Sequence, residues 1–363
     1  MAYVLFGLAC FGVVTSSVFA GMVLWAVPRY LRERRAALAA LAVKPGFTPA
    51  LTLLKPVHGA EPGLETARQV ASRYPNIKAK FLSTSGEPDY INAKVASMEL
   101  MEAEAAYEIL VVSDSDVRVT PDYLRAVALP FADEKVGAMC CPYRGVAAEG
   151  GLWARLEAVG MSVEMTSGVL VARMMEGMQF VLGPTMAFRR DVIRRMGGFK
   201  VTADYCADDF VLGSETFKLG QTVALSTHAI DHMVINSSFW SSMKHQVRWM
   251  KSTRFSRPKG HFGTSLTFSG PFGVLGLVAG AWMGHVWWGV ALLAWSVATR
   301  LAMAVAVGGM VVRDRSWFGL LVLYPVRDLM GFGFWAASYF GRKILWRGKV
   351  FELLPGGRMR AAE

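Results

Sequence analysis

Apolar positions form long runs at the two ends of the chain, whereas in the middle short apolar runs alternate with helical patterns. The segment from Met1 to Pro28 has no charged side chain and exceeds the about twenty apolar residues that a helix needs to cross a bilayer. Arg29, Arg32, Arg34 and Arg35 follow directly. A cleavable signal peptide carries its positive charge before a shorter apolar run, so we predict an uncleaved anchor.

A second apolar territory begins near Phe262. It has no Lys, Arg, Asp or Glu before Arg300, and none between Arg300 and Arg313. This leaves room for two spans joined near Gly284 to Trp288. Positive residues mark the cytoplasmic ends of spans, so both ends of this hairpin and the basic end of the anchor are expected on the cytoplasmic side.

The last apolar stretch, Trp317 to Phe340, is interrupted by Pro325, Arg327 and Asp328. Basic residues on both sides favour a re-entrant or interfacial pair of helices over a single crossing. Arg327 and Asp328 are either a functional site or an ion pair at the headgroup boundary. The predicted parts are an anchor over residues 1–28, a cytoplasmic domain over 44–261, a membrane region over 262–341 and a basic cytoplasmic tail over 342–363.

The cytoplasmic domain has the pattern of an α/β fold. Its apolar runs Ala50–Leu54, Ala79–Leu82 and Glu108–Val112 are typical of strands, and Asn92–Ala106 predicts a helix with Asn92 as its N-cap. Strands alternating with helices predict a parallel sheet, in which ligands gather beyond the carboxyl ends of the strands. Neither a dinucleotide-binding glycine motif after a strand nor a Walker A sequence occurs.

Composition supports a membrane protein and narrows its partners. The chain is 53% hydrophobic and 18% charged, with 39 Lys and Arg against 28 Asp and Glu, which gives a net charge of +11. Much of this excess lies beside the predicted spans, so we expect no nucleic-acid binding. Cys10, Cys140, Cys141 and Cys206 have no CxxC spacing and predict a reduced compartment without a cysteine–histidine metal site.

Acidic side chains follow the third predicted strand. Asp114 and Asp116 lie within Ser113–Asp116, where buried carboxylates need a cation or hydrogen-bond donors. Mg²⁺ or Mn²⁺ takes one or two carboxylates together with phosphate oxygens, and such an ion neutralises a leaving diphosphate. The alternative is a turn that is merely rich in Asp and Ser.

Two further clusters have the same ambiguity. Asp208 and Asp209 can supply a general base, or they can be acidic residues on the dipole of a helix N-terminus. Arg248, Trp249 and Lys251 lie three or fewer residues apart and can offer cationic and stacking groups to a phosphorylated sugar. Taken alone, they are equally a solvated basic face beside the membrane.

These clusters belong to a set of motifs in a fixed order. The set comprises Lys55–Pro62 (KPVHGAEP), Ser113–Arg118 (SDSDVR), Gly183–Arg190 (GPTMAFRR), Gly197–Phe199 (GGF), Ala207–Phe210 (ADDF) and His245–Trp249 (HQVRW). With one N-terminal and several C-terminal membrane segments, the chain resembles the family 2 inverting glycosyltransferases of the membrane-bound lipid type. It is similar to ceramide glucosyltransferases and to bacterial hopanoid glycosyltransferases over nearly its whole length.

The resemblance implies a GT-A-like, Rossmann-like domain that transfers a hexose or N-acetylhexosamine from a UDP-sugar to a lipid hydroxyl with inversion. It implies Asp209 as the catalytic base, and Asp116 with Asp114 at a Mn²⁺ or Mg²⁺ ion. The implied nucleotide-sugar site consists of Lys55, Glu61, Lys94, Asp114 and Arg248. The implied acceptor site consists of Gly183, Thr185, Met186, Asp208, His245 and Trp249. The implied location is the bacterial inner membrane, with the domain facing the cytoplasm.

Several alternatives stay open at this point. The acceptor can be ceramide, a hopanoid polyol or diacylglycerol, and the sequence leaves the oligomeric state undetermined. A non-catalytic membrane scaffold and a processive polysaccharide synthase are the competing functions, although a synthase needs more spans than this chain supplies.

Two departures from the family pattern matter. His245 stands where the family usually has Gln or Arg. A helix–strand unit that ends in a uracil-binding aspartate is missing between Glu61 and the segment that begins at Arg68. Either the unit has been lost, or Glu87 or Asp89 replaces its carboxylate, or the protein is a degenerate relative.

Overall fold

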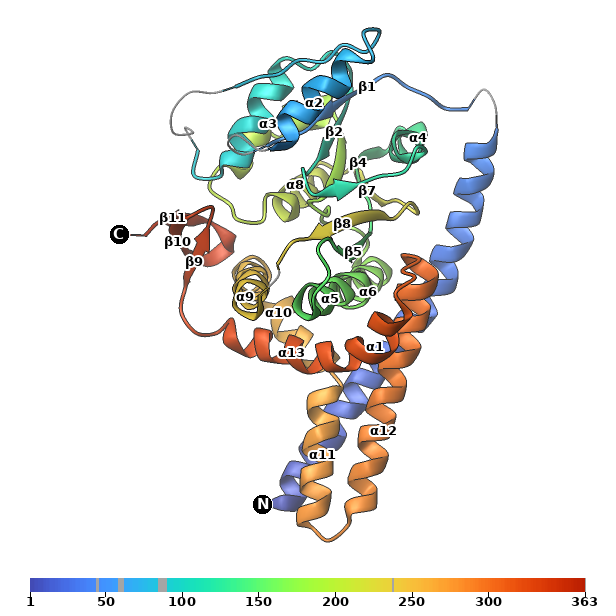
Figure 1. Ribbon diagram of the computed structural model, residues 1–363, viewed down its shortest axis with the longest axis vertical. Helices are drawn as coiled ribbons and strands as arrows, with labels where there is room; N and C mark the ends of the chain where they lie inside the picture. The colour runs from blue at the N-terminus through green and yellow to red at the C-terminus, as the bar shows by residue number, and fades with distance from the viewer. Residues whose placement is uncertain (44–45, 58–61, 84–89, 237, 363) are drawn as a thin grey trace.

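The computed structural model describes residues 1–43, 46–57, 62–83, 90–236 and 238–362 (Figure 1). A globular α/β domain lies at one end of the molecule, and a bundle of long helices projects from it. The predicted class, an α/β domain with one N-terminal and several C-terminal apolar helices, is confirmed.

The centre of the domain is a five-stranded sheet of order β1-β2-β6-β4-β7. Its strands are β1 Leu51–Leu54, β2 Ile109–Ser113, β4 Val136–Cys140, β6 Thr185–Arg189 and β7 Thr222–Leu225. β1 is parallel to β2 and β4 to β7, whereas β6 is antiparallel to both of its neighbours. The other four strands therefore end at the edge where β6 begins. This brings the segment before β6 next to the segment after β2.

The strands of this sheet are continuous apolar runs because both faces are covered. All residues of β2 and β4 are buried. The helices packed around the sheet are α2 Pro62–Ser72, α3 Ala93–Ala103, α4 Tyr123–Ala128, α7 Arg190–Arg195 and α8 Asp208–Lys218, with 3₁₀ turns at Leu129–Ala132 and Phe199–Thr202. α3 begins as predicted, since the Asn92 side chain accepts the backbone N–H of Lys94 at 3.0 Å.

The predicted strand Ala79–Leu82 is wrong, because these residues have no strand structure. Phe81 and Leu82 are exposed. Phe81 lies under the Arg68 guanidinium at 5.0 Å, and Lys80 pairs with Glu104 on the surface. The segment is therefore held by surface contacts, and β1 is the edge strand of the described sheet.

A second, three-stranded sheet of order β3-β8-β5 lies between the central sheet and a layer of helices. Its strands are β3 Val117–Arg118, β5 Tyr143–Ala147 and β8 Ile230–Val234. The layer contains α5 Leu152–Val159, the π-helical turn η2 Gly160–Met165, α6 Thr166–Glu176 and α9 Phe239–Ser256. Asp231 of β8 forms ion pairs with Arg118 and Arg144, which joins all three strands.

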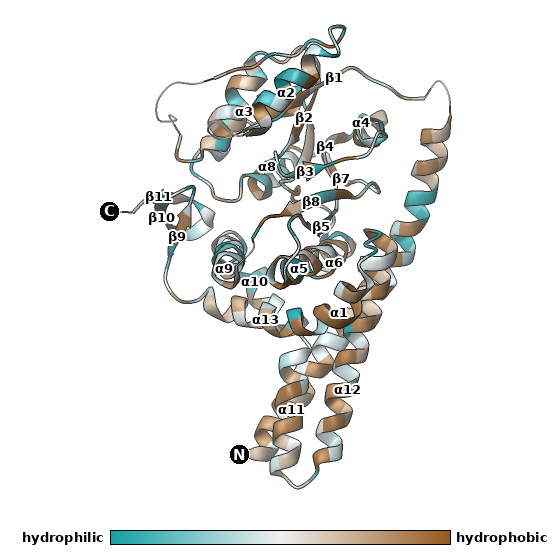
Figure 2. Cartoon of the chain, in the orientation of Figure 1, coloured by the Kyte–Doolittle hydropathy of each residue, from teal (hydrophilic) through white to brown (hydrophobic). Residues whose placement is uncertain are grey.

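The projecting bundle consists of α1 Ala2–Ala42, α11 Gly270–Trp282 and α12 Val286–Met303, which continues as a π-helical segment to Val311. Most of its residues are apolar, apart from the charged C-terminal part of α1 (Figure 2). α11 and α12 form the predicted hairpin, and Gly284 supplies the positive φ of 76° at its turn. α1 continues past Pro28 to Ala42.

Among the described residues, three helices, over residues 2–42, 286–311 and 319–337, are long and apolar enough to cross a membrane. The pair formed by α10 with its 3₁₀ extension (Pro258–Thr267) and α11 passes the same test, although it is bent by 50°.

α13 Tyr324–Ala337, with its π-helical start at Gly319–Leu323, runs across the bundle rather than along it (Figure 1). The re-entrant or interfacial placement expected from its basic flanks stays a prediction, because this helix is also long and apolar enough to cross a membrane. Arg327 and Asp328 do not pair with each other. Arg327 contacts Glu164 and Gln246, whereas Asp328 pairs with Arg300 at 3.1 Å.

The C-terminal residues form a third sheet and not the predicted basic tail. Its strands are β9 Lys343–Trp346, β10 Lys349–Leu353 and β11 Met359–Ala361, with a 3₁₀ turn at Pro355–Gly357. Ile344, Phe351, Leu353 and Met359 enclose Cys206 in a small apolar core. The sheet docks on the segment before α8, where the Met359 N–H donates to the Asp204 carbonyl at 2.7 Å. The sequence prediction rested on the basic residues of this segment and overlooked the apolar residues that alternate with them.

Candidate active site

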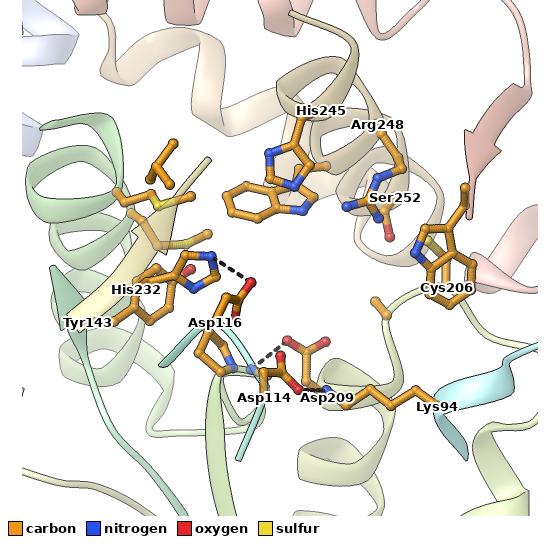
Figure 3. A pocket seen from close by; sticks show the side chains of 18 of the residues that line it. Lys94, Asp114, Asp116, Tyr143, Cys206, Asp209, His232, His245, Arg248 and Ser252 are labelled. Carbon is orange, nitrogen blue, oxygen red and sulfur yellow. Dashed lines mark hydrogen bonds and ion pairs between the residues drawn. The ribbon is translucent and has the colours of Figure 1, made fainter. Parts of the chain in front are cut away.

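A cavity of about 560 Å³ lies at the carboxyl ends of the central strands (Figure 3). The segments after β2 and before β6 form one side, and α9 forms the opposite side. The start of α8, strand β8, η2 and the C-terminal sheet close the remainder. Residues from most of the predicted motifs therefore meet in one place.

The two carboxylates after β2 have different surroundings. Asp114 Oδ1 lies 2.7 Å from the Nζ of Lys94, and the Asp114 carbonyl accepts from Lys55 Nζ at 2.8 Å. Asp116 faces the cavity with 45% of its side chain exposed, and its Oδ2 lies 3.6 Å from His232 Nε2. The negative charge of Asp114 is thus neutralised by Lys94, whereas the Asp116 carboxylate is accessible to a ligand.

Asp116 and His232 are the described residues that fit a divalent cation best. The His232 Nδ1 is buried without a hydrogen-bond partner, and burial lowers the pKa of this imidazole, which favours the neutral form that binds metals. No group of three or more His, Cys, Asp or Glu side chains that could hold a metal occurs among the described residues. An ion here needs further oxygen ligands, which a diphosphate supplies.

Asp208 and Asp209 begin α8 and line the cavity, where Asp208 is buried and Asp209 is half-buried. Asp209 accepts two backbone N–H groups, from Gly183 to Oδ2 at 2.9 Å and from Phe210 to Oδ1 at 2.8 Å. Burial, followed by the like charge of Asp208, raises the pKa of Asp209 to about 6. The two N–H groups orient this carboxylate, and its pKa suits a proton acceptor near neutral pH.

α9 supplies a cationic and aromatic wall. His245, Arg248 and Trp249 all line the cavity. The rings of His245 and Trp249 are 4.5 Å apart, and the His232 ring lies edge-on to Trp249 at 6.5 Å. Burial lowers the pKa of Arg248 from its ordinary high value, yet an arginine remains charged in proteins. The wall can bind an anion beside a stacking surface.

The side of the cavity formed by η2 is apolar. Met161 and Met165 line it there together with Ile235 of the segment after β8. η2 packs against α13, the helix that crosses the membrane bundle. The cavity therefore has a charged region near the sheet and an apolar region near the membrane helices.

The structure brings most of the predicted site residues together. Those that line the cavity are Lys94, Asp114, Asp116, Gly183, Asp208, Asp209, His245, Arg248 and Trp249. Lys55 contacts the Asp114 backbone, and Glu61 lies outside the described residues, as do Glu87 and Asp89.

Thr185 and Met186 do not fit the predicted acceptor role. Both have 0% exposure, because β6 is an interior strand of the sheet. The Thr185 hydroxyl lies 3.2 Å from the Tyr123 hydroxyl inside the domain. An acceptor can reach Gly183 before the strand, but not these two side chains within it.

Sequence reasoning missed cavity residues that lie far from the motifs. These are Tyr143, Glu157, His232, Trp346 and Arg347. The sequence around His232 is distinctive, because a histidine and an acidic residue stand within a short apolar run. Trp346 and Arg347 directly precede a glycine, which is typical of a turn. Neither pattern indicates a site until the pairing of the strands is known.

Comparisons with known proteins find similarity over most of the chain. The model of glycosyl transferase family 21 matches residues 64–359. Ceramide glucosyltransferase 1 of Caenorhabditis elegans is 23% identical over 304 residues, which cover 83% of this chain and 64% of the relative. The chain thus spans less than two thirds of that relative's length.

Two solved structures of S. aureus TarS, residues 1–349, also match. The complex with UDP-GlcNAc has a TM-score of 0.34 and 14% identity, covering 93% of this chain and 96% of that one. The complex with UDP has a TM-score of 0.33 and 14% identity, with 92% and 95% covered. The family match covers most of the residues and agrees with the predicted resemblance to ceramide glucosyltransferases, so the chain belongs to glycosyl transferase family 21.

Proposed function

We propose that this protein transfers a hexose or N-acetylhexosamine from a UDP-sugar to the hydroxyl of a membrane lipid, with inversion at the anomeric carbon. The observation that carries the proposal is the half-buried Asp209 carboxylate, which two backbone N–H groups orient. It lies in one cavity with Asp116 and Arg248. A single displacement needs such a base on one side of the sugar and charge neutralisation of the leaving group on the other.

The bonds, electrons and proton of the proposed reaction are all accounted for in this arrangement. The acceptor oxygen forms a bond to the anomeric carbon, and the bond from that carbon to the diphosphate oxygen breaks. The leaving UDP keeps the electron pair of the broken bond, and the hydroxyl proton passes to Asp209. A single displacement converts an α-linked donor into a β-glycoside.

The diphosphate is expected between α9 and the segment after β2. Arg248 binds its oxygens from one side. A Mn²⁺ or Mg²⁺ ion held by Asp116, with His232 beside it, supplies Lewis-acid neutralisation of the leaving group when bound. Lys94 keeps Asp114 in place at 2.7 Å.

The acceptor is expected to arrive from the membrane side. Met161 and Met165 line the apolar region of the cavity, and η2 packs against α13. A lipid whose chains stay among the helices can extend its hydroxyl past these methionines. A cytoplasm-facing domain at the bacterial inner membrane is the placement that the basic ends of the apolar segments support.

Asp209→Asn tests this function, with the full chain in lipid nanodiscs. The amide keeps the shape of the carboxylate but cannot accept a proton, so kcat should fall by about a hundredfold or more while the KM for the donor changes little. Asp191→Asn makes the same change on the exposed face of α7 and should keep wild-type kcat. Products are measured by lipid mass spectrometry, and the anomer by NMR.

The competing functions give different results. A scaffold without catalysis shows no glycolipid product from the wild type and no heat of UDP binding with Mn²⁺ in calorimetry. A processive synthase gives a ladder of products with many sugars. Either result, or equal losses of turnover and donor binding in Asp209→Asn, contradicts the proposal.

A further inference from the structure

The Glu157 carboxylate lies beneath the wall that α9 forms at the cavity. It is 1% exposed, and no predicted motif contains it. Its Oε1 lies 2.6 Å from His245 Nδ1, and its Oε2 accepts the Ser242 hydroxyl at 2.6 Å. The Asn236 amide donates to both oxygens, at 3.0 and 3.1 Å. Such a buried carboxylate needs these donors, and two of them, His245 and Asn236, line the cavity.

These contacts fix the tautomer of His245. An ionised carboxylate only accepts hydrogen bonds, so the ring proton belongs on Nδ1. Burial raises the pKa of Glu157, but the hydrogen bonds from His245, Ser242 and Asn236 lower it, and the net shift is downward. In the neutral ring the lone pair then lies on Nε2, the nitrogen on the far side of the ring from Glu157.

The ring is also held in position. His245 packs against Trp249 at 4.5 Å, 25% of its side chain is exposed, and it lines the cavity (Figure 3). Gln at this position could donate and accept, and Arg could only donate. In its neutral form, His245 held by Glu157 accepts through Nε2 and cannot donate there.

We propose that Glu157 is a positioning residue that presents His245 Nε2 to the acceptor lipid, so that the enzyme prefers an acceptor with a second hydrogen-bond donor beside the hydroxyl that is glycosylated. This inference rests on the function proposed above. The reacting hydroxyl has one proton, and that proton is directed to Asp209. The partner of Nε2 must therefore be another O–H or N–H group.

This requirement separates the possible acceptor classes. A ceramide has a further hydroxyl and an amide N–H near its primary hydroxyl, and a hopanoid polyol has further hydroxyls. A 1,2-diacylglycerol has one hydroxyl and otherwise only ester oxygens, which cannot donate. Leaving a buried acceptor unpaired should lower kcat/KM for diacylglycerol by about five- to hundredfold.

The test compares acceptors of matched chain length with the full protein in nanodiscs, using UDP-glucose and UDP-N-acetylglucosamine in separate assays with Mn²⁺. The acceptors are a short-chain ceramide, its 3-deoxy-N-methyl analogue and 1,2-dioctanoylglycerol. The wild type should prefer the ceramide over both other acceptors by at least about fivefold. In Glu157→Gln the ratio of kcat/KM for the ceramide to kcat/KM for the other acceptors should fall towards one, while the KM for the donor stays at its wild-type value.

Double-mutant analysis separates positioning from a structural role. His245→Gln should also reduce the preference, and adding Glu157→Gln to it should change the preference no further, because the two residues act as one unit. Glu102→Gln is the matched control, since Glu102 forms a similar ion pair with Arg190 at 2.6 Å outside the cavity. It should leave the preference unchanged.

Three outcomes overturn the inference. If the wild type has equal kcat/KM for ceramide and dioctanoylglycerol, the inference is overturned but the proposed function is not. This comparison needs no variant. A full preference retained in folded Glu157→Gln does so as well. Absence of transfer to every lipid, together with absence of UDP binding, overturns both this inference and the proposed function.

Discussion

Lys94 of α3 lies 2.7 Å from Asp114 and joins the two acidic motifs of the cavity. Its ammonium is also 3.8 Å from Asp208 Oδ2. Burial lowers the pKa of Lys94, but the charges of Asp208 and Asp114 outweigh burial and raise it overall. The lysine therefore stays charged, and the protein itself balances two carboxylates that sequence reasoning had assigned to nucleotide, metal and acceptor.

Lys94→Met should destabilise the domain by about 3 kcal/mol or more, because removing one partner leaves buried charges uncompensated. Lys80→Met is the control. Lys80 pairs with Glu104 in the open, at 2.6 Å with both side chains about half exposed, and such pairs contribute about 1 kcal/mol or less. Denaturant unfolding of both variants in detergent decides the matter. Equal losses would show that Lys94 is not the buried link described here.

The pH dependence of turnover should follow Asp209. Burial and then Asp208 raise its pKa to about 6, and only the ionised form accepts a proton. We therefore expect kcat/KM to rise as pH rises through about 6 and to level off above it. Asp208→Asn removes the like charge and should move this midpoint to lower pH. A midpoint that stays in place or rises in a folded variant contradicts the coupling.

The raised pKa of Asp209 affects the stability of the fold in the opposite direction to turnover: turnover rises with pH, whereas stability falls. The folded-state pKa of Asp209 is raised, so its contribution is fully present below the unfolded pKa of about 3.9 and is lost as pH rises through about 6. Asp209→Asn does not titrate, and its amide nitrogen cannot accept the second backbone N–H, so its stability should change less between pH 4.5 and pH 7 than that of the wild type. Thermal unfolding of the two proteins at pH 4.5 and pH 7 measures this difference.

The sequence predicted the features that depend on local patterns. The apolar runs located β1 and β2, and Asn92 located the start of α3. The charge-free segments located α1 and the α11–α12 hairpin around Gly284. Asp114 and Asp116 were recognised because carboxylates are unusual at the end of a buried strand.

Features that depend on long-range pairing could not be predicted in this way. β6 runs against its neighbours, which places Thr185 inside the sheet while Gly183 reaches the cavity. Glu157 looks like an ordinary helix residue until α5 packs under α9. The C-terminal strands looked like a basic tail because their apolar core is completed by Cys206, a residue far away in the chain.

The contact between α13 and α9 should be disrupted by adding a single methyl group at Gly160. Arg327 donates to the Gln246 Oε1 at 3.0 Å, next to His245 on α9, and pairs with Glu164 of η2 at 3.2 Å. A Cβ at Gly160 would overlap the Arg327 Nε. Gly160→Ala should therefore displace the guanidinium and lower turnover. Gly168→Ala, in α6 with open space around it, should be neutral when initial rates and thermal stability are compared.

The last prediction concerns how the base of the nucleotide is recognised. The described central sheet ends at β1, and the residues at 79–82 that were expected to form a strand do not pair with it. The resemblance to the family implies a uracil-binding aspartate at the end of a strand at this edge, and the described residues form no such strand, so the uracil N3–H lacks that partner among them. An unpaired buried donor costs about 1–3 kcal/mol, or about five- to hundredfold in affinity. We therefore expect UDP, CDP and GDP to compete with similar, weak affinities for the wild-type chain. A wide preference for UDP would contradict this expectation, and Glu87→Gln and Asp89→Asn would then identify which carboxylate reads the base.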